Sequence, residues 1–252
     1  MILNQFRLDN QVATITGGTK GLGKAIAVAL AEAGADIAVV SRNDNPDLKE
    51  AILSLGRRYY HHPADLTRRQ QTRRVIPAVV ENLGDIGILV NNAGIIRRSP
   101  AMDYLEIDWD DTLEIDLTAA FLLSQAAGRI MLKRKSGKII NIASIISFQG
   151  GLNVAAYAAA KHGIAGLTKA LANDWAQHGV NVNAIAPGFF ATELTEALQN
   201  DPVRSESIKG RTPAGRWGSP EDISGAAVFL AAPASDFVHG TVLAVDGGWM
   251  AW

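Results

Sequence analysis

Residues Thr16–Gly23 read TGGTKGLG and stand between an aliphatic run, Val12–Thr16, and an alanine-rich helical pattern, Leu22–Ala33. A strand, a glycine-rich turn and a helix in this order bring free backbone N–H groups and the positive end of a helix to one point, which suits a pyrophosphate. Glycine permits positive φ and leaves no Cβ in the way of a ligand. The spacing G-x-x-x-G-x-G is also compatible with a simple tight corner, but its place after the first strand favours a dinucleotide. The predicted contacts are Gly17, Lys20, Gly21, Leu22 and Gly23.

The rest of the chain alternates short aliphatic runs with longer helical patterns. Strands are predicted at Val12–Thr16, Asp36–Ser41, Arg58–His62, Ile86–Val90, Lys138–Ser144, Val180–Ala186 and Thr241–Val245. Long helices are predicted at Asp103–Lys133 and Val154–Gln177. This alternation predicts an α/β fold, a single Rossmann-type, doubly wound parallel sheet of about seven strands with helices on both faces.

Composition excludes several functions. The 24 Lys and Arg balance 25 Asp and Glu among 252 residues, so a nucleic-acid partner is not expected. There is no Cys, no metal-ligand spacing, no signal peptide and no run of eighteen apolar residues, so we expect no metal, no membrane span and a cytoplasmic location. No linker divides the chain, which predicts one domain over 1–252. The long segment 190–218 is predicted to be a substrate lid.

The end of the second predicted strand bears on the choice of nucleotide. An acidic residue there would bind the ribose 2′-hydroxyl of NAD, but the chain has Ser41 followed by Arg42. A guanidinium suits the 2′-phosphate of NADP, and Lys20 adds a second positive charge. We therefore expect NADP(H) in preference to NAD(H), unless both are ordinary surface charges.

Two side chains one helical turn apart are candidates for proton transfer. Tyr157 and Lys161 share a helix face, and a nearby ammonium favours the phenolate and is expected to lower the pKa of the tyrosine. Ser144 is predicted to end the fifth strand, and Asn91–Gly94 follows the fourth. Because the carboxyl ends of parallel strands share one edge, these groups are expected to meet in one crevice.

This combination resembles the short-chain dehydrogenase/reductase family across nearly the whole chain. The resemblance implies hydride transfer between a nicotinamide and a carbonyl or carbinol carbon. Tyr157 would handle the proton, Ser144 would orient the oxygen, and Lys161 would hold the nicotinamide ribose. The remaining cofactor contacts implied are Asp65, Leu66, Asn92, Gly94, Tyr157, Pro187, Gly188, Phe190 and Thr192.

One position departs from the family pattern. Asp116 stands where relatives usually have an asparagine that supports a water chain to the lysine. An ionised Asp116 would stabilise the Lys161 cation and oppose formation of the tyrosinate, whereas a protonated one could replace the amide as a donor. We expect Asp116 to serve the proton relay with an altered pH optimum.

Several stretches are similar to one branch of the family, the 2-dehydro-3-deoxy-D-gluconate 5-dehydrogenases. They are Asn91–Arg98, Ile142–Gly151, Pro213–Gly218 and Val245–Trp249. A sugar-acid substrate such as 2-dehydro-3-deoxy-D-gluconate would need a guanidinium for its carboxylate and polar partners for its hydroxyls. The candidates are Arg97, Arg98, Gln149 and Arg204. The branch resemblance implies NAD, whereas Arg42 indicates NADP, which also leaves open a reductase working in the opposite direction.

Two other functions remain as alternatives. A 3-oxoacyl-[acyl-carrier-protein] reductase would share the fold and the Ser–Tyr–Lys set, and a nucleotide-sensing protein would keep the fold without turnover. The resemblance also implies a homotetramer, built through the two long helices and the C-terminal strand region. The apolar ending, Trp249–Trp252, is expected to meet a partner surface.

Overall fold

The structure, a computed structural model, describes residues 1–251. Its strands form one parallel sheet in the order β3-β2-β1-β4-β5-β6-β7, which confirms the predicted fold class. The strands are β1 Val12–Thr16, β2 Asp36–Ser41, β3 Tyr59–Pro63, β4 Ile88–Asn91, β5 Gly137–Ile142, β6 Val180–Pro187 and β7 Val242–Val245. The central strands β1, β4 and β6 are buried along their whole length, as expected for a parallel sheet covered on both faces.

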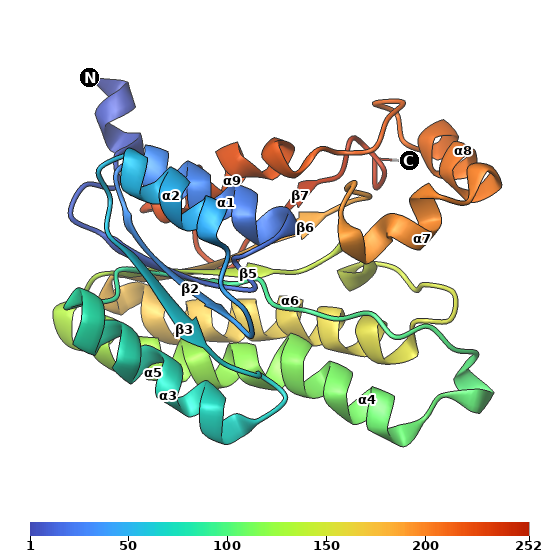
Figure 1. Cartoon of the computed structure of the whole chain (residues 1–252), viewed down its shortest axis with the longest axis horizontal. Coiled ribbons are helices and arrows are strands. Elements are labelled where there is room, and N and C mark those ends of the chain that lie inside the picture. Colours follow the sequence, from blue (N-terminus) through green and yellow to red (C-terminus); the bar gives the residue numbers. More distant parts are fainter. Residues whose placement is uncertain (252) are drawn as a thin grey trace.

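Helices cover both faces of the sheet (Figure 1). They are α1 Gly21–Glu32, α2 Pro46–Ser54, α3 Arg69–Leu83, α4 Glu106–Leu113, α5 Ala119–Arg134, α6 Ala155–Trp175, α7 Glu196–Gln199, α8 Pro202–Arg211 and α9 Ser224–Ala231. On one face, α1 and α9 pack with β1 and β2 around one hydrophobic cluster. On the other, α3, α5 and α6 share a second cluster. Because helices occupy both faces of the sheet, the ends of the strands are where the sheet can border a ligand site.

The helix predicted at Asp103–Lys133 is present, but its start and its regularity differ from the prediction. A 3-10 turn, Ala101–Asp103, precedes a continuous helix, Glu106–Arg134, which contains a π-helical turn at Glu114–Thr118. By length and composition alone this helix is long and apolar enough to cross a membrane, although it contains no run of eighteen apolar residues. It packs instead against α3 and α6 as part of the layer below the sheet, and 44% of its most apolar window is buried.

Other boundaries shift by one or two residues at strand ends, and one shift bears on the site. Strand β5 ends at Ile142 rather than Ser144, so Ser144 begins the following 3-10 turn, Ile145–Ser147. The pairing of β3 with β2 begins at Tyr59 and that of β4 with β5 begins at Ile88, so Arg58 and Ile86 lie outside the sheet.

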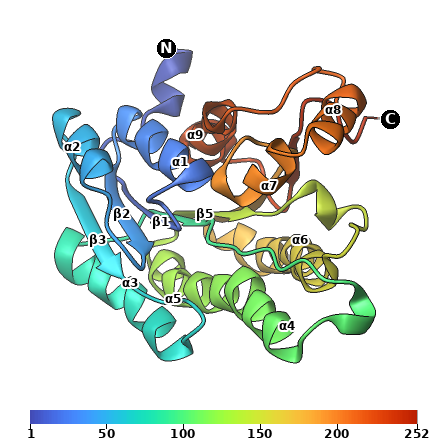
Figure 2. The ribbon, with the colours of Figure 1, turned by 45° about the vertical axis from the view of Figure 1, so that its right-hand side comes forward.

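The segment 190–218 leaves the sheet after β6 and returns at the same point. Its ends are joined by two backbone hydrogen bonds, from Ala191 N–H to Gly218 O (2.8 Å) and from Gly218 N–H to Phe189 O (2.9 Å). Between them lie α7 and α8, which Figure 2 shows near the start of α6.

The C-terminal residues do not present the expected apolar surface. Trp249 is only 6% exposed, with its ring 4.7 Å from that of Phe189 and 4.2 Å from the Arg211 guanidinium. It packs with Ile208 of α8 and Ile145, so it anchors the segment 190–218 within the same chain. Trp252, also part of that expectation, lies outside the described residues.

Candidate active site

The glycine-rich turn has the backbone geometry that its sequence predicts. Gly17 and Gly21 have φ values of +63° and +52°, which other residues adopt only with strain. A Cβ on Gly23 would lie 2.3 Å from Gly17 O, so the helix can approach the turn only with glycine there. No side chain caps the start of α1 at Lys20. The first N–H groups of the helix are therefore available to an anion such as a pyrophosphate.

Hydrogen bonds between the end of β1 and the residues after β4 hold this turn in place. The sequence analysis did not predict them. Thr16 Oγ1 accepts hydrogen bonds from Asn92 N–H and Ala93 N–H, both at 2.9 Å. The Asn92 side-chain amide donates to Thr16 O (2.8 Å) and Gly17 O (3.2 Å). The Asn92 side chain thus supports the turn itself, which is a different contact from the cofactor contact that the resemblance implies.

The predicted nucleotide-selecting residues lie at the ends of β2 and β3. Arg42 is exposed, and its charge reaches Asp65. Partial burial acts to raise the pKa of Asp65, but hydrogen bonds from Thr67, followed by Arg68 and Arg42, hold that pKa below its usual range. The Lys20 ammonium is engaged elsewhere than at Arg42 and Asp65. It forms an ion pair with Glu193 at the start of segment 190–218.

The other predicted cofactor contacts differ in whether their side chains are buried in the core or lie beside a glycine of the site. Leu66 (7% exposed) and Phe190 (4%) have their side chains in the core, so any cofactor contact there would involve mainly backbone. Gly188 lets Asp246 approach, since a Cβ would be 2.7 Å from Asp246 Cα, and Pro187 ends β6 directly before it. Thr192 lies over the glycine-rich turn, 3.5 Å from the position of a Cβ on Gly21.

Ser144, Tyr157 and Lys161 meet beyond the carboxyl end of β5. Ile146 N–H donates to the Ser144 hydroxyl oxygen (3.1 Å), which leaves the Ser144 hydrogen free to donate elsewhere. Tyr157 and Lys161 lie one turn apart in α6, with Lys161 Nζ 5.4 Å from the centroid of the Tyr157 ring. The Ser144 side chain is close enough to Tyr157 to lower the pKa of that phenol.

A second set of contacts ties these groups to the sheet. Lys161 Nζ donates to Ile142 O, the last carbonyl of β5, over 2.9 Å. The Ser147 hydroxyl donates to Lys161 O over 2.6 Å and so fixes the 3-10 turn after Ser144 against α6. The sequence signal for Ser147 is its place three residues after Ser144, which completes a capping box.

Asp116 lies inside the same cluster. Its carboxylate is 3.3 Å from Lys161 Nζ through Oδ2, and Oδ1 accepts a hydrogen bond from Ile95 N–H over 2.8 Å. Gly94 makes room for it, because a Cβ there would be 3.0 Å from Asp116 Oδ2. Burial is the main cause that raises the pKa of Asp116, and Lys161 opposes this effect. For Lys161, Asp116 and then Tyr157 outweigh burial and raise the pKa of the ammonium.

The charges around Tyr157 act in opposite directions. Burial raises the pKa of Tyr157 most, Lys161 lowers it, Asp116 raises it, and Ser144 and Arg98 lower it. The net result is a pKa of Tyr157 above the usual value. Lys161 thus acts on this phenol in the expected direction, but burial, to which Asp116 adds, outweighs the ammonium, so the net shift of the pKa is upward.

The four candidate substrate residues separate in the structure. Arg97 is directed to α4, where its Nε lies 3.4 Å from Asp108 Oδ1. Arg98 is exposed, and its charge reaches the Tyr157 hydroxyl. Gln149 is half-buried in the loop that follows the Ser144 turn, and Arg204 is exposed on α8. Arg97 therefore forms an ion pair with Asp108, whereas the charge of Arg98 contributes to lowering the pKa of Tyr157.

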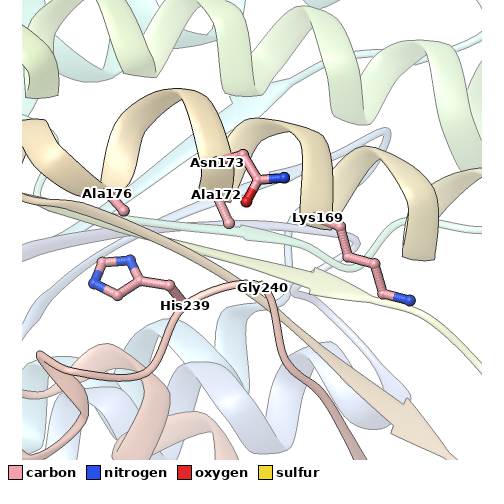
Figure 3. Close-up of a pocket in the computed structure, with 6 residues that line it drawn as sticks. All are labelled: Lys169, Ala172, Asn173, Ala176, His239 and Gly240. Carbon is pink, nitrogen blue, oxygen red and sulfur yellow. The ribbon is translucent and has the colours of Figure 1, made fainter.

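Two cavities lie away from these groups. One of about 430 Å³ is lined by Lys169, Ala172, Asn173 and Ala176 of α6 and by His239 and Gly240 before β7 (Figure 3). The other, of about 240 Å³, lies at the base of segment 190–218 and includes Phe190 among its lining residues. Ser144, Tyr157 and Lys161 line neither. Over residues 1–251, no group of three or more His, Cys, Asp and Glu side chains is arranged to hold a metal ion.

Comparisons with known proteins cover the whole chain. Residues 17–250 match the family model described as enoyl-(acyl carrier protein) reductase. The 2-dehydro-3-deoxy-D-gluconate 5-dehydrogenase of Dickeya dadantii (strain 3937) is 48% identical over 252 residues, which are 100% of each chain. The protein of the same name from Bacillus subtilis (strain 168) is 48% identical over 97% of this chain and 96% of its own. The structure of a gluconate 5-dehydrogenase from Burkholderia cenocepacia J2315, in complex with NADP and tartrate, is 42% identical with a TM-score of 0.96 over 100% of both chains.

Proposed function

Because this chain belongs to the short-chain dehydrogenase/reductase family, we propose that it is an NADP(H)-dependent oxidoreductase that interconverts a hydroxyl and a carbonyl group of a small sugar acid. The substrate class is that of 2-dehydro-3-deoxy-D-gluconate, the compound in the names of two relatives. The observation that carries the proposal is the meeting of Ser144, Tyr157 and Lys161 at the carboxyl edge, within reach of the Arg98 charge.

The residues present fit a dinucleotide. The uncapped start of α1 and the glycine-rich turn would hold the pyrophosphate, and Arg42 would pair with a 2′-phosphate. Lys161 would bind the nicotinamide ribose, and Gly94, Gly188 and Thr192 would border the cofactor. NADP(H), when bound, supplies or accepts the hydride. The structure of the Burkholderia cenocepacia relative contains NADP, which supports the same choice here.

The roles of the polar side chains follow from their hydrogen bonds. Tyr157 gives its hydroxyl proton to the substrate oxygen in reduction and accepts one in oxidation. Ser144 donates to the same oxygen, since its own oxygen already accepts from Ile146 N–H. The Lys161 ammonium donates to Ile142 O and faces Asp116, so one of its three hydrogens remains for the cofactor.

Arg98 is the proposed partner of the substrate carboxylate. A guanidinium binds a carboxylate through two parallel hydrogen bonds, which would fix the sugar acid with its reacting carbon near Tyr157. We propose that segment 190–218 closes over the substrate as a lid, with Arg204 contributing from α8 and Gln149 from the facing loop. The paired base at Ala191 and Gly218 supports this role.

The acyl-thioester alternative has one observation in its favour, the printed description of the matching family model. A panel of substrates separates the two functions. The absorbance of reduced nicotinamide would be followed with NADPH and NADH, each with 5-keto sugar acids and with an acetoacetyl thioester. We expect turnover of a sugar acid with NADPH. Turnover of the thioester alone would support the acyl reductase, and cofactor binding without any turnover would support a nucleotide-sensing protein.

A homotetramer and a cytoplasmic location complete the proposal. Phe121 is 40% exposed and Trp109 is 38% exposed on the long helix Glu106–Arg134, and β7 is the last strand of the sheet. An apolar helix face and a strand with one open edge are the kinds of surface that a second copy covers. Light scattering in dilute solution tests this assembly, and a monomer would contradict it.

The lack of Cys supports a reducing compartment.

A further inference from the structure

Asp116 lies in the π-helical turn Glu114–Thr118, which interrupts the helix between α4 and α5. π-helical turns are rare and often occur at functional sites. This one sends two acidic side chains to different environments. Glu114 pairs with Arg69 of α3 near the surface, whereas the Asp116 side chain is 0% exposed. The turn therefore places one carboxylate in the protein interior.

Two neighbours hold the buried carboxylate. Ile95 N–H donates to Oδ1 over 2.8 Å, and Lys161 Nζ lies 3.3 Å from Oδ2. The Lys161 side chain is itself only 5% exposed. A buried charge is tolerated only when it is paired, so each of these two charges depends on the other.

Lys161 is shared between two acidic groups. Its ammonium is 3.3 Å from Asp116 and 5.4 Å from the centroid of the Tyr157 ring. The charged groups that act on Tyr157 come from three elements: Lys161 from α6, Asp116 from the π-helical turn and Arg98 from the segment after β4. The Ser144 side chain also acts to lower the pKa of Tyr157. Phenolate formation would place a second negative charge around one buried ammonium.

We propose that Asp116 is a positioning residue of the reaction, whose ionised carboxylate neutralises the Lys161 ammonium so that Tyr157 keeps its proton across neutral pH. This inference rests on the proposed role of Tyr157 as the proton-transferring group. An unpaired ammonium would favour the phenolate, whereas the negative charge of Asp116 offsets part of that effect. The raised pKa of Tyr157, to which burial contributes most and Asp116 adds, is consistent with this arrangement.

The proposal has a specific consequence for the pH dependence of both reaction directions. Reduction requires Tyr157 as a phenol, and oxidation requires it as a phenolate. One ionisation therefore limits reduction at high pH and oxidation at low pH. A change at Asp116 must move both limits together, whereas damage to the fold would lower both rates without moving either.

The test uses Asp116→Asn, which keeps an oxygen for Ile95 N–H and removes the charge. Ionisation of tyrosine is followed by ultraviolet difference absorption in the full-length protein without substrate. Subtraction of the Tyr157→Phe titration isolates Tyr157. We expect Tyr157 in Asp116→Asn to ionise at lower pH than in the unmodified protein, and both rate limits to shift downward by the same amount. Asp110→Asn, an exposed acid on α4, is the matched control and should change neither.

An unchanged Tyr157 titration in a folded Asp116→Asn protein would overturn the proposal. Asp116 would then be either protonated in the unmodified protein or without effect on the ionisation of Tyr157. If that variant does not fold, tyrosine labelled with ¹³C at the ring carbon that bears the oxygen reports Tyr157 in the unmodified protein by NMR. A phenol at neutral pH is the expected result, and a phenolate would overturn the proposal. These titrations need no turnover, so they remain decisive even if the sugar-acid substrate is wrong.

Discussion

The Lys20 ammonium in the glycine-rich turn forms an ion pair with Glu193 at the start of segment 190–218. The two side chains are 68% and 64% exposed, so water screens their attraction. The pair nevertheless connects the proposed pyrophosphate site to the proposed lid. The ion pair also occupies the Lys20 ammonium, which the sequence analysis predicts to contact the 2′-phosphate of NADP.

Glu193→Gln should therefore strengthen binding of NADP⁺. The substitution frees Lys20 for the 2′-phosphate, and an exposed pair of this kind is worth about 0.2–1 kcal/mol, or roughly a 1.4- to 5-fold change in Kd. Binding of NAD⁺ should change less, since it lacks that phosphate. Calorimetric titration of both cofactors measures the difference, with Glu196→Gln on α7 as the control. Weaker NADP⁺ binding in Glu193→Gln would show that the ion pair supports the site instead.

Arg42→Gln should reduce the preference for NADP⁺. Loss of a charge-assisted hydrogen bond costs about 1.5–3 kcal/mol, so the Kd for NADP⁺ should rise roughly 10- to 100-fold, with that for NAD⁺ nearly constant. Arg73→Gln removes an exposed arginine from α3 and is the control. Equal losses for both cofactors would mean that Arg42 contributes to the fold or to the adenosine rather than to the phosphate.

Arg98→Gln and Arg97→Gln form a matched pair for the substrate carboxylate. Because the Arg98 charge acts on Tyr157 and Arg98 is the proposed partner of the carboxylate, its loss should raise KM for a sugar acid about 10- to 100-fold with a smaller effect on kcat. Arg97 pairs with Asp108, so Arg97→Gln should change KM little. Steady-state kinetics with a sugar acid and with a neutral keto sugar provide the comparison. The reverse ranking of the two variants would refute the assignment.

Tyr157→Phe should remove turnover while cofactor binding persists. The hydroxyl transfers the proton, and loss of general acid–base catalysis typically lowers kcat about 10²- to 10⁴-fold. Tyr60→Phe on β3, whose hydroxyl contacts His62 over 3.2 Å, is the control and should retain full activity. Retained turnover in Tyr157→Phe would exclude the proposed chemistry.

The ion pair of Arg216 and Asp222 predicts a pH-dependent contribution to stability near the lid base. Hydrogen bonds from Arg216, and then from Ser219 N–H, lower the pKa of Asp222 to about 2. A carboxylate with a depressed pKa stabilises the fold above its unfolded value, 3.8, and that stability is lost as the pH falls toward about 2. Asp222→Asn should therefore be less stable by at most about 1 kcal/mol at neutral pH, because the pair is exposed. Urea denaturation at decreasing pH should show the gap closing, and a constant gap would contradict this origin.

Local patterns in the sequence predict the fold and the main reacting groups. The glycine-rich turn after β1 and the spacing of Tyr157 and Lys161 depend only on backbone conformation and helical repeat. Both are properties of neighbouring residues, so the sequence alone predicts them. The parallel sheet follows in the same way, from strands that alternate with helices.

Contacts between distant segments required the tertiary structure. The choice between Arg97 and Arg98, the burial of Trp249 against Phe189, and the brace of Thr16 by Asn92 involve residues far apart in the chain. The direction of the Tyr157 pKa shift is a further example, since the sequence suggests Lys161 but not the burial that opposes it.

What the sequence by itself determined is the sheet, the glycine-rich turn after β1 and the one-turn spacing of Tyr157 and Lys161, the groups proposed for proton transfer. Only the tertiary structure decided their charge balance, because a π-helical turn brings Asp116 to within 3.3 Å of Lys161 in a site closed to water. Electrostatic energies depend on distance through space and on burial, and neither is a property of spacing along the chain.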